Sequence, residues 1–360
     1  MTTQEEIVDE IIISHTDTGS GVAEQQKAMS SAMSSIDTVS LSRSFGDKAA
    51  VRGIDLDVAE GSIFGLLGPN GAGKTTVVRM LTTLLAPTGG SARVGGFEIT
   101  RQAARVRRVI GVALQETALD PLMTGREMLT LQAALHALPA KAARKRADAL
   151  LEALELGEVA AARVKTYSGG TRRRLDLALA LIHSPAVLFL DEPTTGIDPT
   201  SRQAIWDQIR SLSSERGATV FLTTQYLEEA DRLCDEIAIM DAGRVVRRGV
   251  PETLKAAVDV PTLRVTASAG QREQAAAVLA RFGTARAVQR GAVGIGLAAG
   301  AAAMADVIRA LDEAGIDITH VALDMPTLDD VFADATGRRM PAAAADEPGR
   351  VEAAAVEEQV

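Results

Sequence analysis

Short apolar runs alternate with segments whose apolar residues recur every three or four positions along most of the chain. The runs SIFGLLG (62–68) and AVLFLDE (186–192) are almost wholly apolar, which predicts strands buried on both faces of a sheet. Three more runs share this character, namely VIGVALQ (109–115), TVFLTTQ (219–225) and EIAIMDA (236–242). Polar residues and a helical pattern follow most of them, so the sequence predicts an α/β domain with a parallel sheet and helices on both faces.

Two helical segments stand out in this pattern. The segment TTVVRMLTTLL (75–85) directly follows the first strand run, and its apolar residues at helical spacing are Val77, Leu81, Leu84 and Leu85. A longer segment, from about 116 to 166, is helical throughout and interrupts the alternation with strands. It predicts an inserted helical subdomain.

The pattern restarts after about residue 258 in the order strand, helix, strand, strand, helix, strand. This order predicts a small ferredoxin-like α+β domain over 258–337, with TLDDVFADAT (327–336) as a final helix. The main domain is then expected over 37–257. Residues 1–36 and 338–360 are rich in small and polar residues, and we expect loose extensions there.

Composition narrows the class of protein. The 360 residues are 46% hydrophobic with a net charge of −9, which favours a large core and argues against a nucleic-acid binder. The single cysteine, Cys234, allows no internal disulfide, and no cluster of Cys and His suggests a metal site. The acidic N-terminus does not resemble a secretory signal, and the uncharged stretch at 291–305 is too short to span a bilayer. We therefore expect that the chain does not cross a membrane by itself.

The sequence GPNGAGKT (68–75) fits the phosphate-binding pattern G-x-x-x-x-G-K-[ST] between a strand and a helix. Glycines let the backbone N–H groups converge on phosphate oxygens, Lys74 supplies an ammonium to the outer phosphates, and Thr75 supplies an oxygen to Mg²⁺. The predicted cofactors are therefore ATP and Mg²⁺. The expected contacts are Gly68, Pro69, Asn70, Gly71, Ala72, Gly73, Lys74, Thr75 and Thr76.

Two adjacent acids end the run AVLFLDE. A carboxylate at the C-terminal end of a strand faces the crevice where such sheets bind ligands, so Asp191 is expected to hold Mg²⁺. Glu192 beside it is expected to activate the attacking water. The alternative is a strand end with two solvated acids.

A second anion-binding helix start is predicted at YSGG (167–170), where Ser168 precedes an amphipathic helix and Gly169 and Gly170 leave backbone N–H groups open. Because the first loop already binds one triphosphate, this turn would serve another nucleotide or another copy of the chain. The alternative is an ordinary helix cap.

These stretches, together with Gln115 in VALQE, GIDP (196–199) and TTQYLEEAD (223–231), resemble the nucleotide-binding subunit of ABC transporters over about 37–249. The whole chain further resembles the daunorubicin-resistance type of drug-export ATPase. That finer likeness is carried by TTQYLEEAD, by RRRLDLA (172–178), by the extra C-terminal domain and by PTLDDVF (326–332). The resemblance implies a P-loop ABC ATPase cassette with a helical subdomain.

The resemblance also implies roles for individual residues. It implies a head-to-tail homodimer with two ATP molecules, in which the loop at Lys74 faces the partner's Ser168–Gly170 turn. Gln115 would approach Mg²⁺ and the attacking water, and Asp198 would cross the dimer interface. Phe45 matches the aromatic residue that stacks on adenine, with a core Phe as the alternative.

One position departs from the broader family, which has His where this chain has Gln225. Gln225 can donate an N–H to a phosphate oxygen, but it is neutral and cannot titrate. His183 is too distant in the pattern to replace it. We expect hydrolysis to continue through Glu192, with Gln225 contributing to the rate.

The family resemblance implies a separate multi-span ABC-2-type permease as partner, no nucleic acid, and a position at the cytoplasmic face of the membrane. The export of drugs or hydrophobic natural products is expected. The alternatives are export of a lipid or polysaccharide, a soluble ABC ATPase acting on ribosomes or DNA, and a regulatory module without turnover. Basic runs at 105–108, 141–146 and 172–174 would face anionic lipid or simply be solvated.

Overall fold

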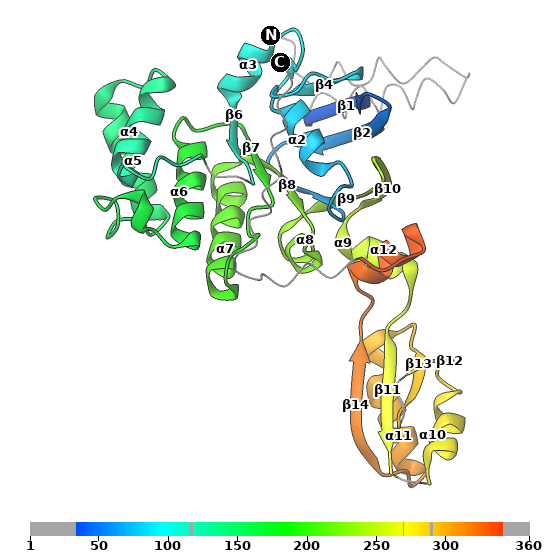
Figure 1. Cartoon of the computed structure of the whole chain (residues 1–360). Coiled ribbons are helices and arrows are strands. Elements are labelled where there is room, and N and C mark those ends of the chain that lie inside the picture. The colour runs from blue at the N-terminus through cyan, green and yellow to red at the C-terminus, as the bar shows by residue number, and fades with distance from the viewer. Residues whose placement is uncertain (1–33, 116–117, 269, 289–290, 341–360) are drawn as a thin grey trace, which may run out of the picture.

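In the computed structural model, the described residues are 34–115, 118–268, 270–288 and 291–340 (Figure 1). The expected extensions therefore lie mostly outside them. Strand β1 (Ser34–Phe45) nevertheless begins before the expected boundary at residue 36, because Ile36 is fully buried between two sheets. At the other end, the Met340 N–H donates to Asp329 Oδ1 at 3.0 Å, so the ordered chain continues past residue 337.

The central sheet has six strands in the order β10-β9-β3-β8-β7-β6. Their bounds are β3 (Ile63–Leu67), β6 (Ile110–Ala113), β7 (Val187–Asp191), β8 (Thr219–Thr224), β9 (Glu236–Asp241) and β10 (Arg244–Gly249). All five apolar runs are strands of this sheet, paired in parallel as predicted. Only the edge strand β10 pairs antiparallel.

A second, antiparallel sheet in the order β2-β1-β4-β5 covers one face of the cassette (Figure 1). Its other strands are β2 (Lys48–Ala59), β4 (Gly89–Val94) and β5 (Phe97–Glu98). Helices α2 (Lys74–Leu81) and α3 (Ala103–Val109) share its apolar core with residues of β3, β7 and β8. The other face of the central sheet carries α6 (Gly169–Leu181), α7 (Pro199–Arg216) and α8 (Leu227–Leu233).

The first predicted helix is shorter than its apolar pattern suggested. Helix α2 ends at Leu81, and Thr83 takes a positive φ of 63° directly after it. Leu84 consequently leaves the apolar face and is 60% exposed, whereas Val77 and Leu81 are fully buried. The prediction for Leu84 was therefore wrong.

The region from 118 to 166 is helical and packs against α6 (Figure 1). It contains α4 (Gly125–Leu135), α5 (Ala140–Ala153) and the 3₁₀ helix η1 (Val164–Thr166). A capping box between Thr124 and Glu127 fixes the start of α4. The Tyr167 hydroxyl donates to Val159 O at 2.6 Å, which closes the subdomain onto the chain that enters α6.

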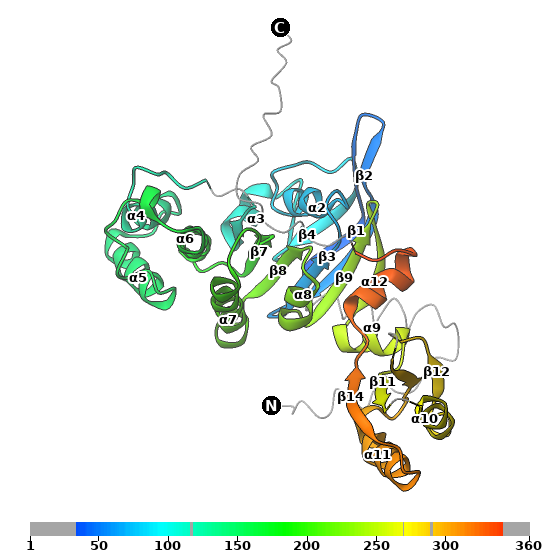
Figure 2. The same cartoon turned by 60° about the horizontal axis from the view of Figure 1, so that its bottom comes forward.

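After α9 (Pro251–Val258) the chain enters a small domain that projects from the cassette (Figures 1 and 2). Its elements are β11 (Thr262–Ala267), α10 (Arg272–Leu279), β12 (Thr284–Arg286), β13 (Val293–Gly296), η2 (Gly300–Ala303), α11 (Met304–Glu313) and β14 (Ile318–Asp324). The antiparallel order β12-β13-β11-β14 is that of a ferredoxin-like sheet.

Helix α12 (Leu328–Thr336) returns from this domain to the cassette and packs beside α9 (Figure 2). Leu328, Val331 and Phe332 are buried in the cassette core, and Arg338 pairs with Asp241 at 2.6 Å. The small domain is therefore held at both of its ends. Within the described ranges, none of the helices is long and apolar enough to cross a membrane.

Candidate active site

The loop between β3 and α2 is shaped by glycines in tight surroundings. Gly73, the N-cap of α2, has a φ of 105°, and a Cβ there would lie 2.6 Å from Ala50 O. A Cβ on Gly68 would lie 2.3 Å from Met240 O. Any larger residue at either position would displace the loop backbone, so the glycines are required for the approach of β2 and β9 to this loop.

Lys74 lies at the centre of the site. Its Nζ donates to Gly68 O at 2.7 Å and to Pro69 O at 3.2 Å, and it lies 3.4 Å from Glu192 Oε1. Burial lowers the pKa of Lys74, and the carboxylates of Glu192 and Asp191 counteract that effect. The ammonium is thus held at the loop, within reach of any anion that the loop binds.

Asp191 ends β7 and faces the start of α2. Its Oδ1 accepts from Thr223 Oγ1 at 2.5 Å and from Thr75 Oγ1 at 3.3 Å. Its Oδ2 is buried and has no hydrogen-bond partner among the residues that the structure describes. A buried carboxylate oxygen without a partner beside a threonine hydroxyl fits a hard divalent cation such as Mg²⁺.

Glu192 follows with a positive φ of 48°, which is an uncommon conformation for a residue other than glycine. Its backbone N–H donates to Thr223 O at 3.1 Å, which supports this geometry. Its Oε2 accepts from Gln115 Nε2 at 3.4 Å and from Thr195 Oγ1 at 3.2 Å. The carboxylate is therefore oriented by neighbours on both sides, as a general base must be.

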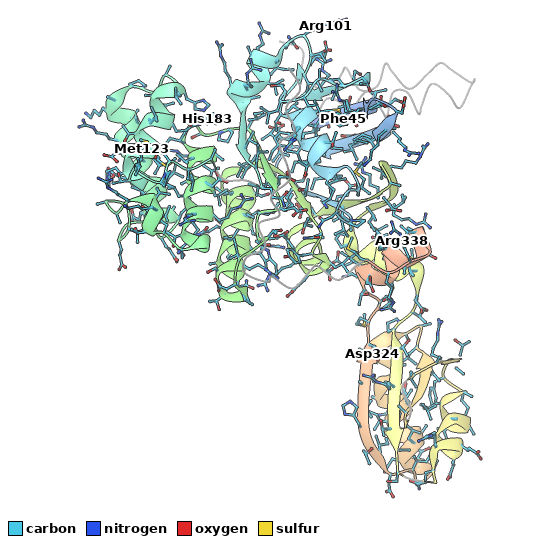
Figure 3. All side chains as sticks on the ribbon, viewed as in Figure 1. Phe45, Arg101, Met123, His183, Asp324 and Arg338 are labelled. Atoms are coloured by element: carbon cyan, nitrogen blue, oxygen red, sulfur yellow. The ribbon has the colours of Figure 1, made fainter. Side chains whose placement is uncertain are left out.

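A cavity of about 690 Å³, the nucleotide groove, joins these residues to the end of the β1–β2 hairpin. Phe45 lies in it, 48% exposed, with the Arg43 guanidinium 4.7 Å from its ring centroid (Figure 3). The alternative of a core Phe is wrong. Sequence reasoning missed six lining residues, and only the basic character of the hairpin pointed toward the first and the fourth of them: Lys48, Ala49, Ala50, Arg52, Ala242 and Gly243.

The Ser168 turn lies elsewhere. Ser168 caps α6 by accepting from the Thr171 N–H at 3.1 Å, and both Ser168 and Gly169 are exposed and absent from the lining of the nucleotide groove. Asp198 is exposed and caps α7 through the Ser201 N–H at 3.0 Å. A Cβ on Gly170 would lie 3.0 Å from Ser201 Oγ, so the two helix starts are neighbours.

Gln225 follows β8 and is half-buried. The preceding Thr224 O accepts from the Gly68 N–H at 3.2 Å, which places Gln225 next to the phosphate loop but outside the groove lining. The His183 Nε2–H donates to Ile110 O at 2.9 Å, and the His183 ring stacks on His136 with ring centroids 3.8 Å apart. His183 instead lines a different cavity, the second groove, away from Phe45 (Figure 3).

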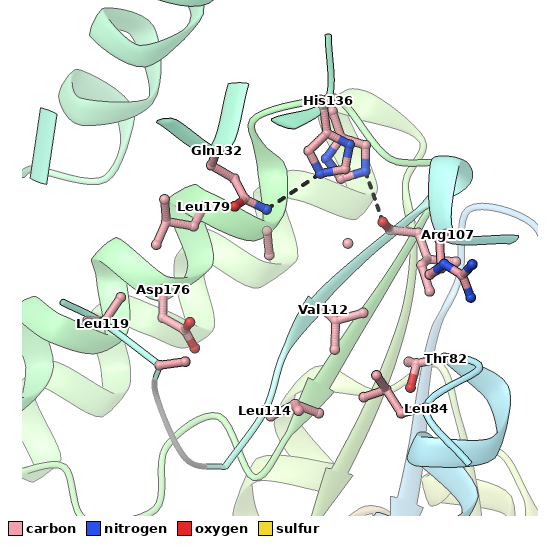
Figure 4. A pocket seen from close by; sticks show the side chains of 15 residues that line it. Thr82, Leu84, Arg107, Val112, Leu114, Leu119, Gln132, His136, Asp176 and Leu179 are labelled. Carbon is pink, nitrogen blue, oxygen red and sulfur yellow. Dashed lines mark hydrogen bonds between the residues drawn. The ribbon is translucent and has the colours of Figure 1, made fainter. Parts of the chain in front are cut away.

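This second groove, of about 440 Å³, lies between α4, α6 and β6 (Figure 4). Apolar side chains such as Leu84, Val112 and Leu119 line it together with Asp176. Burial raises the pKa of Asp176 to about 6, although the nearby Arg173 guanidinium opposes the shift. The groove is mainly apolar with a buried acid in its wall.

Known proteins resemble this chain in sequence and in fold. The family described as ABC transporter matches residues 51–195. The chain is 49% identical over 294 residues, 81% of its length and 93% of the relative's, to the daunorubicin resistance ATP-binding protein DrrA3 of Streptomyces coeruleorubidus. It is 41% identical over 305 residues, 84% and 92% of the two lengths, to the daunorubicin/doxorubicin resistance ATP-binding protein DrrA of Streptomyces peucetius.

A Nod factor export ATP-binding protein of Paraburkholderia xenovorans is 46% identical over 59% of this chain and 69% of its own. Among solved structures, the dimeric post-hydrolysis ATP-binding cassette MJ0796 bound to ADP and Pi is 26% identical with a TM-score of 0.55, covering 60% of this chain and 98% of that chain. The chain therefore belongs to the ATP-binding subunits of ABC transporters, within the daunorubicin-resistance type, and is the ATPase subunit of an ABC exporter.

Proposed function

We propose that two copies of this chain clamp two Mg·ATP molecules head to tail and drive export of drugs or hydrophobic natural products. The pore would be a separate ABC-2-type permease, which holds the ATPase at the cytoplasmic face of the membrane. The named drug-resistance relatives support the substrate class. A relative named for Nod factor export has the same cassette and a different cargo, so the cargo is set outside the site described above.

One observation supports the proposed head-to-tail dimer. The phosphate loop at Lys74 and the exposed Ser168 turn are both built to bind anions, yet the turn does not line the groove of its own chain. A second copy in antiparallel orientation brings the free turn onto the nucleotide of the first. A similar solved cassette is described as dimeric, which agrees with this arrangement.

Each residue then has a role in hydrolysis. Lys74 binds the outer phosphates, and Thr75 with Asp191 holds Mg²⁺, which neutralises phosphate charge when bound. Glu192 orients the attacking water and takes its proton. Gln115 orients Glu192 by donating from Nε2 to its Oε2. Gln225 donates to the terminal phosphate from the end of β8.

The second groove is suited to the permease. It lies on the helical subdomain side and is lined by exposed Leu84 and other apolar residues. A short apolar helix from the cytoplasmic side of the permease fits such a groove, so movement of the subdomain would reach the pore.

The dimer is tested with Glu192→Gln, in which nucleotide is retained. Light scattering with Mg·ATP should show twice the monomer mass, whereas Glu192→Gln combined with Gly169→Arg in the turn should stay monomeric while still binding ATP. Glu192→Gln combined with Arg172→Met is the matched control and should still dimerise. A strictly monomeric Glu192→Gln protein, with its permease present, would overturn the proposal.

Transport is tested in inverted vesicles that contain this chain and its ABC-2-type permease partner. ATP-dependent accumulation of daunorubicin should require both proteins and should be lost with Glu192→Gln. Uptake of a lipid or polysaccharide in place of the drug would reassign the cargo. ATPase activity that is unchanged by the permease would instead favour a non-transport target.

A further inference from the structure

Arg173 is one of three consecutive arginines, yet its environment differs from that of its neighbours. It lies on α6 and is only 7% exposed, whereas Arg172 is exposed and Arg174 is half-buried. The interpretation of residues 172–174 as a solvated or lipid-facing basic run is therefore wrong for Arg173. A buried guanidinium is costly unless its N–H groups are bonded, so its partners identify what it does.

The guanidinium binds backbone carbonyls from two separate segments. Its Nε donates to Pro193 O at 2.9 Å and its Nη2 to Asp191 O at 3.0 Å. Its Nη1 donates to Leu114 O at 2.6 Å and also to Asp176 Oδ2 at 3.0 Å, on the same helix. Burial lowers the pKa of Arg173, and the carboxylates of Asp176 and Asp191 act against that change.

Each of these carbonyls belongs to a residue that flanks the reaction chemistry. Asp191 and Pro193 stand on either side of Glu192, and Leu114 directly precedes Gln115. The planar guanidinium holds its donors in a fixed relation, so the two segments are held at one distance from each other and from α6. The Gln115–Glu192 hydrogen bond at 3.4 Å lies just beyond this bridge.

Arg173 itself belongs to α6, the helix that begins at the Ser168 turn. Arg173 lies three residues after Gly170, within the first two turns of α6. Less than two helical turns therefore separate the Ser168 turn from the guanidinium that binds the carbonyls around Glu192 and Gln115.

We propose that Arg173 is a positioning residue that couples the two nucleotide sites of the dimer. This proposal rests on the head-to-tail dimer. When the partner's nucleotide binds at the Ser168 turn, α6 and Arg173 draw the Gln115 and Glu192 segments of the same chain into their reactive positions. Each site is then fully active only when the opposite site is filled, which produces positive cooperativity in ATP.

The test compares Arg173→Lys and Arg173→Met with the matched control Arg172→Met, in the full chain reconstituted with its permease. Lysine keeps the charge and is therefore the variant chosen to preserve the fold. Its three N–H donors share one nitrogen, so they cannot reproduce the spacing of the guanidinium's bonds to the three carbonyls. For both Arg173 variants we expect kcat to fall by roughly 10- to 100-fold, because even a small misplacement of catalytic groups slows the reaction by this much. The Kd for Mg·ATP should stay within about threefold, because the phosphate loop is not touched.

The decisive readout is the Hill coefficient for ATP, which a merely structural role would not move selectively. It should fall to about 1 in the Arg173 variants and stay at the wild-type value in Arg172→Met. If Arg173→Lys keeps both the wild-type kcat and the wild-type Hill coefficient, the coupling role is overturned and the dimer proposal survives. A wild-type protein that hydrolyses ATP without cooperativity and without dimerising would overturn both.

Discussion

The ammonium of Lys74 lies 3.4 Å from a carboxylate oxygen of Glu192, and the two side chains are only 4% and 5% exposed. A buried ion pair of this kind leaves an uncompensated charge when one partner is removed. In this site, however, the anion that Lys74 is expected to bind is a phosphate. The pair therefore places Glu192, the proposed general base, next to Lys74, the proposed phosphate ligand. The charge of a bound nucleotide would compete with Glu192 for the ammonium of Lys74.

Glu192→Gln should bind Mg·ATP at least as tightly as the wild-type protein, because the amide no longer competes for Lys74. Its phosphate release should fall by about 10²-fold or more, because the amide cannot accept the proton of the attacking water. Binding is followed with a fluorescent ATP analogue and turnover with a phosphate assay. The matched control is Glu228→Gln on the exposed side of α8, which should change neither quantity. Hydrolysis at the wild-type rate by Glu192→Gln would assign the base elsewhere.

Gln225→Ala should slow hydrolysis, but by less than the roughly 100-fold that follows loss of a well-placed donor, because Gln225 lies beside the groove without lining it. Gln225→His should introduce a titratable donor, so the rate should acquire a new pH dependence in the range where histidine titrates. Steady-state kinetics across this pH range measure both effects. Identical pH profiles for wild type and Gln225→His would show that position 225 does not reach the phosphate.

Much of this architecture could be predicted from local pattern. Each buried parallel strand is a continuous apolar run, and the conformation of the phosphate loop depends on glycines at fixed spacing. Both features can therefore be recognised from a short stretch of sequence. The early end of α2 was not visible, because Leu84 continues the apolar spacing and the positive φ of Thr83 has no sequence signal.

Arg173 shows a different kind of limit. The sequence does not distinguish the three consecutive arginines at 172–174. Only the fold places the middle one, Arg173, against backbone carbonyls, which belong to Leu114, Asp191 and Pro193. Those carbonyls lie 18 to 59 residues away in the chain, so no local pattern connects them. Helical spacing alone places Arg173 and Leu177 on one face of α6, and both are buried. That was the one available signal.

The carboxyl of Asp176 should make stability fall as pH rises. Burial raises its pKa from 3.8 to about 6, so the folded state holds its proton more tightly than the unfolded state. This contribution is therefore complete below about pH 4 and is lost as the pH rises through about 6, by about 1 to 3 kcal/mol.

Asp176→Asn should flatten the dependence of Tm on pH between about pH 4 and pH 7, relative to wild type. Burial lowers the pKa values of His136 and His183 in the same groove, which gives a dependence of opposite sign, so the difference between the two proteins isolates Asp176. Asp148→Asn, at an exposed position, should keep the wild-type slope. An unchanged slope in Asp176→Asn would mean that this carboxyl titrates at its ordinary value.

Phe332→Ala should detach the small C-terminal domain from the cassette while leaving nucleotide binding intact. Phe332 is fully buried where α12 packs beside α9, and removing a buried aromatic ring typically costs about 3 to 5 kcal/mol. The nucleotide groove contains no residue of α12, so the affinity for Mg·ATP should not change. Limited proteolysis should therefore cut the chain near the connections to the small domain, at 259–261 and 325–327, faster than in wild type.

Ile308→Ala, which truncates a partly exposed apolar residue on α11, is the control and should leave both connections resistant. If Phe332→Ala lowers ATP affinity as much as it speeds proteolysis, α12 supports the whole cassette rather than anchoring the small domain.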